Sequence, residues 1–380
     1  MSVFSKLNED TLGVIREFLS VEDFLKLCLT SKEIYSETKK IKFLKLNKNY
    51  SLKFYEDEDE EEEFRNRVLS SIDDPSKQLS LDLSNYPNVS DVSALGGVHT
   101  LNLSGCHNVI DYSALGSVHT LDLSDCYNLS DCSALGGVHN LNLSGCYNVI
   151  DVSALGGVYN LDLRKCGKVR DVSALGGVHT LDLTDCPNVI DVSALGEIHT
   201  LNLSVCVNVS DVSALGGVHT LNLGATNVRD VSALGGVHTL DLRGCRNVID
   251  VSALGKVHNL NLWRCVNVRD VSALGGVHTL NLSLCDNVSD VSALGSVHTL
   301  NLGATNVRDV SALGGVHTLN LRFCDNVSDV SALGKVHTLD LTDCPNVSDV
   351  SALGKVYNLD LRMTNVCDVS ALGKVVNLIV

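Results

Sequence analysis

Residues 98–117 read VHTLNLSGCHNVIDYSALGS, and close copies of this stretch fill most of the chain. Its Leu-x-Leu pair, Leu101 and Leu103, recurs every 20 residues, from a first copy at Leu81 to a partial last copy at Leu378. Three steps are 19 residues long, namely those that follow Leu221, Leu300 and Leu359. A fixed period near 20 residues predicts a solenoid in which each coil buries one face against its neighbours.

The first half of a coil predicts a strand. Leu101 and Leu103 alternate with Thr100, Asn102 and Ser104, which is the pattern of a half-buried strand with its leucines directed into the core. In the second half, Asp111 stands where it can cap a short helical turn through residues 113–115 by accepting backbone N–H bonds. We expect Gly116 to let the chain turn back towards the next strand. A coil of this length has room for a turn of 3₁₀ helix only.

A cysteine follows the strand in most coils, as Cys106 does in this one. The three 19-residue coils replace it with Thr226, Thr305 and Thr364. The exchange indicates a small buried group that bonds to the backbone in the turn after the strand. No Cys-x-x-Cys pair occurs, so buried thiol packing is favoured over zinc binding.

The repeat resembles the leucine-rich-repeat family, whose general form is Leu-x-x-Leu-x-Leu-x-x-(Asn/Cys)-x-Leu. Val98, Leu101, Leu103, Cys106 and Val109 stand at its apolar and Asn/Cys positions. The resemblance covers residues 79–380 in about 15 repeats. It implies an α/β solenoid, either a horseshoe or a gently curved superhelix, with parallel strands on the concave face and short 3₁₀ turns on the convex face. Repeats this uniform are also similar to those of leucine-rich-repeat proteins in large DNA viruses.

Residues 7–37 form a different segment, with apolar residues at helical spacing that predict three short amphipathic helices. The segment resembles the F-box. The matching positions are Leu7, Asp10, Leu12, Ile15, Phe18, Leu19, Asp23, Leu25, Leu29, Ser31 and Lys32. Two positions depart from the F-box pattern, because Asn8 replaces its proline and Tyr35 its tryptophan. The alternative is a helical cap on the solenoid.

These patterns divide the chain into residues 1–45, an F-box-like three-helix unit, residues 46–78, and the solenoid from residue 79 to 380. The middle segment holds eight consecutive acidic residues, Glu56 to Glu63, whose mutual repulsion predicts a solvated loop. Residues 63–72 predict a helix that covers the first coil together with Pro75. At the other end, residues 378–380 predict an edge strand, and uncovered edges favour weak self-association.

Twelve of the 13 histidines occupy one repeat position, which Tyr159 and Tyr357 take in two coils. A metal array and a pH sensor are both conceivable, but duplication of one ancestral repeat explains the column without either. A metal site needs ligands that converge on a point, whereas a column holds its imidazoles on parallel vectors. We therefore expect no metal or other cofactor, and we expect destabilisation at low pH as neighbouring imidazolium charges repel.

Composition narrows the function classes. A net charge of −16 argues against a nucleic-acid surface, and no apolar run is long enough to span a membrane. The absence of a signal-like N-terminus predicts a cytoplasmic or nuclear protein, not a secreted one, with its 14 cysteines reduced. No phosphate loop, His-Glu-x-x-His or Gly-x-Ser-x-Gly motif occurs, and repetition of the same groups along one face does not predict an enzyme.

What remains is a binding surface. Variation concentrates at the third and fourth residues after each Leu-x-Leu start, and it is densest in the coils between residues 240 and 323. The candidate target-binding residues there are Arg243, Trp263, Arg264, Leu284, Arg322 and Phe323. Drift on a tolerant surface is the alternative. We also expect Trp263 to lie one strand from Arg243, close enough for a cation–π contact.

Together, the two resemblances imply the substrate-recognition subunit of a cullin–RING ubiquitin ligase. Its F-box would bind the Skp-family adaptor by apolar burial of Leu7, Leu12, Ile15, Phe18, Leu19, Phe24 and Leu25. The solenoid would hold an unidentified target protein near the ubiquitin-loading subunit. The alternatives are a protein-interaction scaffold with no ligase link, and a decoy that occupies the adaptor without delivering a target.

Overall fold

The computed structural model describes residues 43–56, 63–70 and 72–380. The chain divides into two compact units, one that ends at Val169 and one that spans Arg170–Val380. The predicted three-helix segment and all seven predicted adaptor-binding residues lie outside the described residues.

Unit 1 begins with a small helical region ahead of its coils. Its elements there are β1 (Leu44–Lys45), α4 (Lys48–Glu56), α5 (Glu63–Ser70), α6 (Pro75–Gln78) and β2 (Leu79–Asp82). Its remaining strands are β3 (Thr100–Asn102), β4 (Thr120–Asp122), β5 (Asn140–Asn142) and β6 (Asn160–Asp162). Its 3₁₀ turns are η2 (Ser93–Leu95), η3 (Ser113–Ser117), η4 (Ser133–Gly137) and η5 (Ser153–Gly157).

Unit 2 consists of coils alone. Its strands are β7 (Thr180–Asp182), β8 (Thr200–Asn202), β9 (Thr220–Asn222), β10 (Thr239–Asp241), β11 (Asn259–Asn261), β12 (Thr279–Asn281), β13 (Thr299–Asn301), β14 (Thr318–Asn320), β15 (Thr338–Asp340), β16 (Asn358–Asp360) and β17 (Asn377–Ile379). Its 3₁₀ turns are η6 (Ser173–Gly177), η7 (Ser193–Leu195), η8 (Leu215–Gly217), η9 (Ser232–Gly236), η10 (Ser252–Leu254), η11 (Ser272–Gly276), η12 (Ser292–Leu294), η13 (Ser311–Gly315), η14 (Ser331–Leu333), η15 (Ser351–Leu353) and η16 (Ser370–Leu372).

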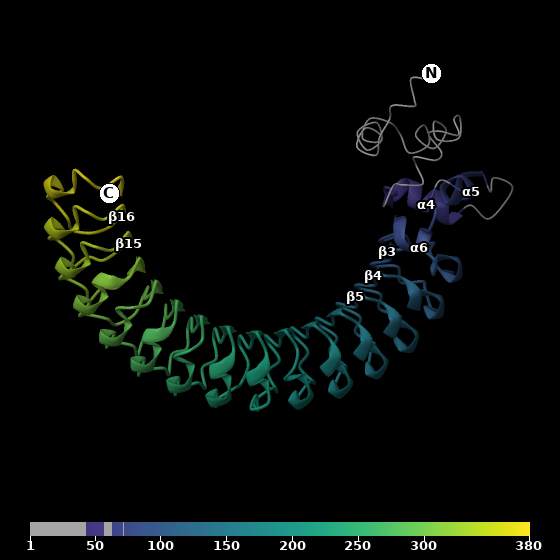
Figure 1. The fold of residues 1–380 in the computed structure, drawn as a ribbon, viewed down its shortest axis with the longest axis horizontal. Helices are drawn as coiled ribbons and strands as arrows, with labels where there is room; N and C mark the ends of the chain where they lie inside the picture. Colours follow the sequence, from purple (N-terminus) through teal and green to yellow (C-terminus); the bar gives the residue numbers. More distant parts are fainter. Residues whose placement is uncertain (1–42, 57–62, 71) are drawn as a thin grey trace, which may run out of the picture. The chain divides into compact units, whose positions relative to one another are not determined.

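The strands pair in parallel and in sequence order within each unit, which confirms the predicted solenoid. Leu101 lies opposite Leu121 and Leu240 opposite Leu260, so equal positions of successive coils form columns. In each unit the strands lie on the inner side of the curve and the 3₁₀ turns on the outer side (Figure 1). Each strand residue therefore belongs to a ladder that runs along one face.

The core consists of the columns that the sequence predicts. Val98, Leu101, Leu103, Cys106 and Val109 are each at most 3% exposed. The same positions are buried in coil after coil, so the coils contribute leucine and valine side chains, and most of them a cysteine, to one continuous apolar interior in each unit. This burial is what fixes the outward direction of the alternating polar positions.

The aspartate before the 3₁₀ turn accepts a backbone N–H of that turn, as predicted, although it stands one residue ahead of the N-cap. The Asp131 side chain accepts the Ser133 backbone N–H at 2.9 Å, and this bond is the main reason why the pKa of Asp131 lies below its ordinary value. The glycine after each turn has a different role from the one expected. Gly116 does not adopt a positive φ, but a Cβ there would collide with the carbonyl oxygen of Ala134 in the next coil. Close approach between coils, not a backward turn, requires that glycine.

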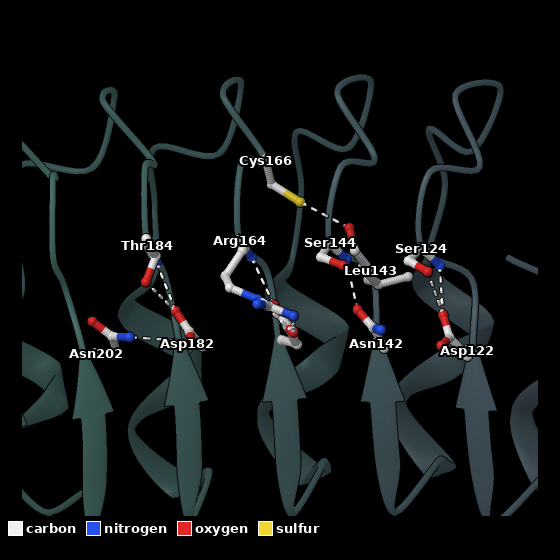
Figure 2. A network of polar contacts seen from close by, with 11 residues as sticks. Asp122, Ser124, Asn142, Leu143, Ser144, Arg164, Cys166, Asp182, Thr184 and Asn202 are labelled. Atoms are coloured by element: carbon white, nitrogen blue, oxygen red, sulfur yellow. Dashed lines mark hydrogen bonds and ion pairs between the residues drawn. The ribbon is translucent and has the colours of Figure 1, made fainter. Parts of the chain in front are cut away.

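The cysteine column bonds to the backbone, as expected, but across coils. The Cys166 thiol donates to the Leu143 carbonyl oxygen at 3.2 Å (Figure 2). Burial raises the pKa of the Cys146 thiol to about 12, so such thiols stay protonated and able to donate. Thr226 instead donates to the Leu223 carbonyl of its own coil at 2.6 Å. The threonine hydroxyl therefore bonds to a backbone carbonyl of its own coil, whereas the cysteine thiol bonds to a carbonyl of the preceding coil.

The segment ahead of the coils is more structured than the sequence predicted. Strand β1 and helix α4 were missed, and the helix expected over residues 63–72 is α5, which ends at Ser70. The Asp82 N–H donates to Ser51 Oγ at 2.9 Å, which ties α4 to β2. Arg65 of α5 donates to the Phe54 and Tyr55 carbonyls at the end of α4. The core of this region is Phe54, Phe64 and Val68.

Candidate protein-binding face

The strand face carries an Asn or Asp at the end of nearly every strand. In Figure 2, Asp122 accepts the Ser124 N–H at 2.8 Å and Asn142 accepts the Ser144 N–H at 2.9 Å, both in unit 1. In unit 2, Asp182 accepts the Thr184 N–H at 2.9 Å. This side-chain bond fixes the first turn after the strand, so the next residues leave the sheet in the same way in every coil.

The fourth residue after each Leu-x-Leu start adopts a left-handed conformation. Glycine takes this position at Gly105, Gly145 and Gly244, with φ of 70–75°. Elsewhere it is held by Asn or Asp, which tolerate the conformation, or by residues that disfavour it, including Val205 (φ 64°) and Phe323 (φ 59°). Their side chains are exposed, 41% for Val205 and 49% for Phe323. Because the conformation recurs in every coil, the coils differ at this position in the side chain that they expose.

The six predicted target-binding residues follow strands β10, β11, β12 and β14, and we call them the arginine–aromatic cluster: Arg243, Trp263, Arg264, Leu284, Arg322 and Phe323. Arg264, Leu284 and Phe323 occupy left-handed positions, and Trp263 is half-buried beside them. The coil between β12 and β14 contributes only Gly303 and Ala304 at the same two positions. The cluster therefore has two parts, separated by a coil with small side chains.

The expected cation–π pair has a different partner. The guanidinium over the Trp263 ring belongs to Arg264, at 5.9 Å from the ring centroid, not to Arg243. Arg243 instead makes an ion pair with Asp241 in its own coil, at 2.8 Å. The sequence did contain a signal for this ion pair, namely the aspartate at the end of the strand, because an arginine two residues later can reach its carboxylate. A second pair of the same kind places Arg322 5.3 Å from the centre of the Phe323 ring.

Sequence reasoning missed three residues next to the cluster. Arg246, Val266 and Asp286 line a hollow of about 400 Å³ together with Arg264 and Leu284. Arg246 and Asp286 each follow the buried cysteine of their coil, and so does Val266. This position varies between coils as much as the two that were singled out, and that variation could have identified it.

The histidine column forms a continuous stack of rings in each unit. In unit 2 it runs from His179 to His337 and ends on Tyr357, with successive ring centroids 4.6–4.8 Å apart. The ring Nδ1 of His298 lies 3.2 Å from Oγ1 of Thr299. Among the described residues no three His, Cys, Asp or Glu side chains are grouped so that they could hold a metal ion. The described part of the chain also has no helix that combines the length and apolarity of a membrane span.

Comparison with known proteins agrees with the fold. No protein-family model matches the sequence, and no curated protein matches it. Among solved structures, a leucine-rich-repeat protein of Leptospira interrogans is 15% identical with a TM-score of 0.52, over 78% of this chain and 94% of that one. TLR13, solved in complex with ssRNA13, is 17% identical with a TM-score of 0.55, over 80% of this chain and 57% of that one.

A third similar structure is the functional domain of InlJ from Listeria monocytogenes, which includes a cysteine ladder. It is 19% identical with a TM-score of 0.49, over 78% of this chain and 66% of that domain. Similarity at these identities bears on architecture alone. The chain folds as a leucine-rich-repeat solenoid of parallel strands and 3₁₀ turns.

Proposed function

We propose that this chain is a protein-interaction scaffold and that the arginine–aromatic cluster of unit 2 binds its partner. The observation that carries this proposal is the placement of Arg264, Leu284 and Phe323 at left-handed positions where glycine would be unstrained. Each exposes an arginine or apolar side chain on the strand face. Trp and Arg at the centre of a surface are also the residues that most often dominate protein interfaces.

The surroundings of the cluster support a protein partner over other ligands. Most other strand-face positions are Thr, Asn, Asp or Ser, so the cluster is an apolar and cationic island in a neutral to acidic surface. A nucleic acid would need a continuous positive groove, and the chain has a net charge of −16. A protein partner matches a surface of this composition, because interfaces combine a buried aromatic centre with a polar rim.

The test compares Trp263→Ala and Phe323→Ala with Tyr147→Ala in the full chain. Tyr147 is an equally exposed ring, 48% against 49% for Phe323, but it belongs to unit 1 and is not part of the cluster. We expect the first two variants to weaken binding of a recovered partner by at least about tenfold, the loss typical of an interface hot spot. Unchanged binding in both, with far-ultraviolet circular dichroism as for wild type, would reject the proposal.

The ligase link is a finer proposal that rests on sequence alone. The F-box resemblance of residues 7–37 supports it, because a solenoid that holds a target and a helical segment that holds an Skp-family adaptor together make a recognition subunit. Co-purification of the intact chain with the adaptor tests it, beside an Ile15→Asp, Phe18→Asp double variant. Adaptor bound by wild type and lost from the variant supports the link. If neither the wild-type chain nor the double variant binds the adaptor, the ligase link is rejected and the scaffold proposal remains.

A further inference from the structure

Arginines on the strand face are generally neutralised by nearby aspartates. Arg164 pairs with Asp162 at 2.6 Å, Arg243 with Asp241 at 2.8 Å and Arg362 with Asp360 at 2.6 Å, each within one coil. Arg322 follows an Asn and reaches Asp340 of the next coil, at 3.8 Å. These short pairs hold the guanidinium charge close to a carboxylate and reduce its pull on an incoming anion.

Arg246 and Arg264 break this pattern. The strand of the Arg264 coil ends in Asn261 instead of Asp, and Arg264 stands one residue further on, at the left-handed position. Within the described part of the chain neither arginine makes an ion pair or donates a side-chain hydrogen bond. Both side chains are exposed. The Arg264 guanidinium lies over the Trp263 ring, and among the described residues neither guanidinium group is held in an ion pair with a carboxylate.

The two arginines line the same hollow of about 400 Å³. Its other walls are apolar, from Val266 and Leu284, except for Asp286. Strands β10, β11 and β12 hold these walls in register, because Leu240 pairs with Leu260 and Leu260 with Leu280. Arg264 and Leu284 share left-handed φ values of 59° and 60°, so the backbone takes the same course at both residues. The hollow is thus fixed by the backbone of three coils.

We infer that this hollow receives the carboxylate of an Asp or Glu side chain from the protein partner, with an apolar neighbour of that residue packed on Val266 and Leu284. The inference rests on the proposed binding function and assigns its chemistry. Two arginines and one aspartate leave one net positive charge in the hollow, which a single carboxylate neutralises. A guanidinium can bind a carboxylate through two parallel N–H bonds. A dianionic phosphate would leave an excess negative charge beside Asp286.

The experiment selects peptides on the full chain from a display library of random sequences about a dozen residues long. Binding of the enriched peptides is then measured by fluorescence anisotropy on Arg246→Gln, Arg264→Gln, Trp263→Ala and the matched control Arg269→Gln. Arg269 is an exposed arginine of the same coil that does not line the hollow. Each peptide is also made with its acidic residue replaced by the amide and by phosphoserine, and a single-stranded RNA oligonucleotide is a further probe.

We expect the enriched peptides to share an acidic residue beside an apolar one. Arg246→Gln and Arg264→Gln should each raise the Kd of the acidic peptide at least about tenfold, whereas Arg269→Gln should not. Replacing the acidic residue of the peptide by the amide should weaken binding to the wild-type chain. The same replacement should change binding to the Arg264→Gln chain little, because the arginine that the acid contacts is already lost. Acid-free peptides, or affinity that depends on Trp263 but not on either arginine, overturn the inference and leave the proposed function standing. No enriched peptide, or peptides indifferent to all four variants, counts against both. Tighter binding of the phosphoserine peptide or of RNA replaces the carboxylate with a phosphate ligand.

Discussion

At the scale of single residues, the side chain at the left-handed position after each strand affects both folding stability and partner binding. A non-glycine residue there carries a strain of about 1–2 kcal/mol. Twelve described non-glycine residues take this position, four of which are Asn or Asp and tolerate it, while Gly105, Gly145 and Gly244 avoid the strain altogether. An apolar side chain that remains exposed at such a position gains nothing from the core in return. Binding is the contribution that we expect to offset the strain at Leu284 and Phe323.

This competition predicts opposite effects on stability and binding. Leu284→Gly should raise the free energy of unfolding by up to about 1 kcal/mol, because glycine relieves the strain at φ 60° and loses part of that gain to chain entropy. The same substitution should weaken partner binding. The reciprocal control Gly244→Ala should lower stability by a similar amount, since its added Cβ meets no atom closer than 4.0 Å and only strain remains. Urea denaturation measures both, and a destabilised Leu284→Gly chain would contradict the strain argument.

A neighbouring pair of glycines tests the packing of coil on coil. A Cβ on Gly96 would collide with the Ala114 carbonyl oxygen, whereas one on Gly97 has nothing within 4 Å. Gly96→Ala should therefore lower the free energy of unfolding by roughly 1–3 kcal/mol, the usual range for overpacking. Gly97→Ala should leave it nearly unchanged. Equal urea midpoints for the two variants would show that the coils adjust more freely than their geometry suggests.

At the scale of the coil, most of the structure could be predicted from periodicity. Leu101 and Leu103 are buried, Asp131 caps its turn, and Thr226 replaces a cysteine, all as their pattern indicates. The errors arose where a partner in space decides the outcome. Trp263 pairs with Arg264 because Asp241 holds Arg243, and Gly116 is needed because the Ala134 carbonyl comes close. Such contacts depend on coil spacing, which the pattern of one coil does not contain.

The stacked imidazoles predict a loss of stability at mildly acidic pH. Burial and then a neighbouring imidazole lower the pKa of His99 and His119 below the ordinary value of 6.5. The unfolded chain consequently takes up these protons first. The stabilisation is complete above pH 6.5 and is lost as the pH falls through the folded pKa values. The capping aspartates do not interfere, because their pKa values lie below 3.8 and their contribution is lost only at lower pH.

The measurement is the urea midpoint at pH 7.5 and at pH 5.5. It should fall between them in wild type and fall less in a His219→Tyr, His258→Tyr, His317→Tyr triple variant, because the pKa of each of these three histidines lies below its ordinary value. Tyrosine is a suitable replacement because the chain itself uses Tyr357 in the same column, stacked on His337 at 4.8 Å. A triple variant with the wild-type pH dependence would show that other groups control acid stability.

At the scale of the whole molecule, the fold was predictable and the partner was not. Fifteen near-copies of one coil, from Leu81 to Leu359, predict a solenoid, and the residues that differ between coils do not change this prediction. The α4 helix was not predicted, because it buries only Ser51 and Phe54 and so shows little apolar periodicity. Self-association through β17, cytoplasmic or nuclear location and the Skp-family adaptor stay predictions. We propose that the uniform coils form the scaffold and that the few coils that differ determine which partner binds.

Site-specific photo-crosslinking from the full chain is the most direct test of whether the variable coils contact the partner. A benzophenone amino acid replaces Leu284 or Phe323 in the arginine–aromatic cluster, or Ser272 on the 3₁₀ turn of the same region. We expect one protein to be crosslinked from both cluster positions but not from position 272. Excess unlabelled wild-type chain should compete for this crosslinking, and the Trp263→Ala chain should not. Equal crosslinking from position 272, or equal competition by Trp263→Ala, would contradict it.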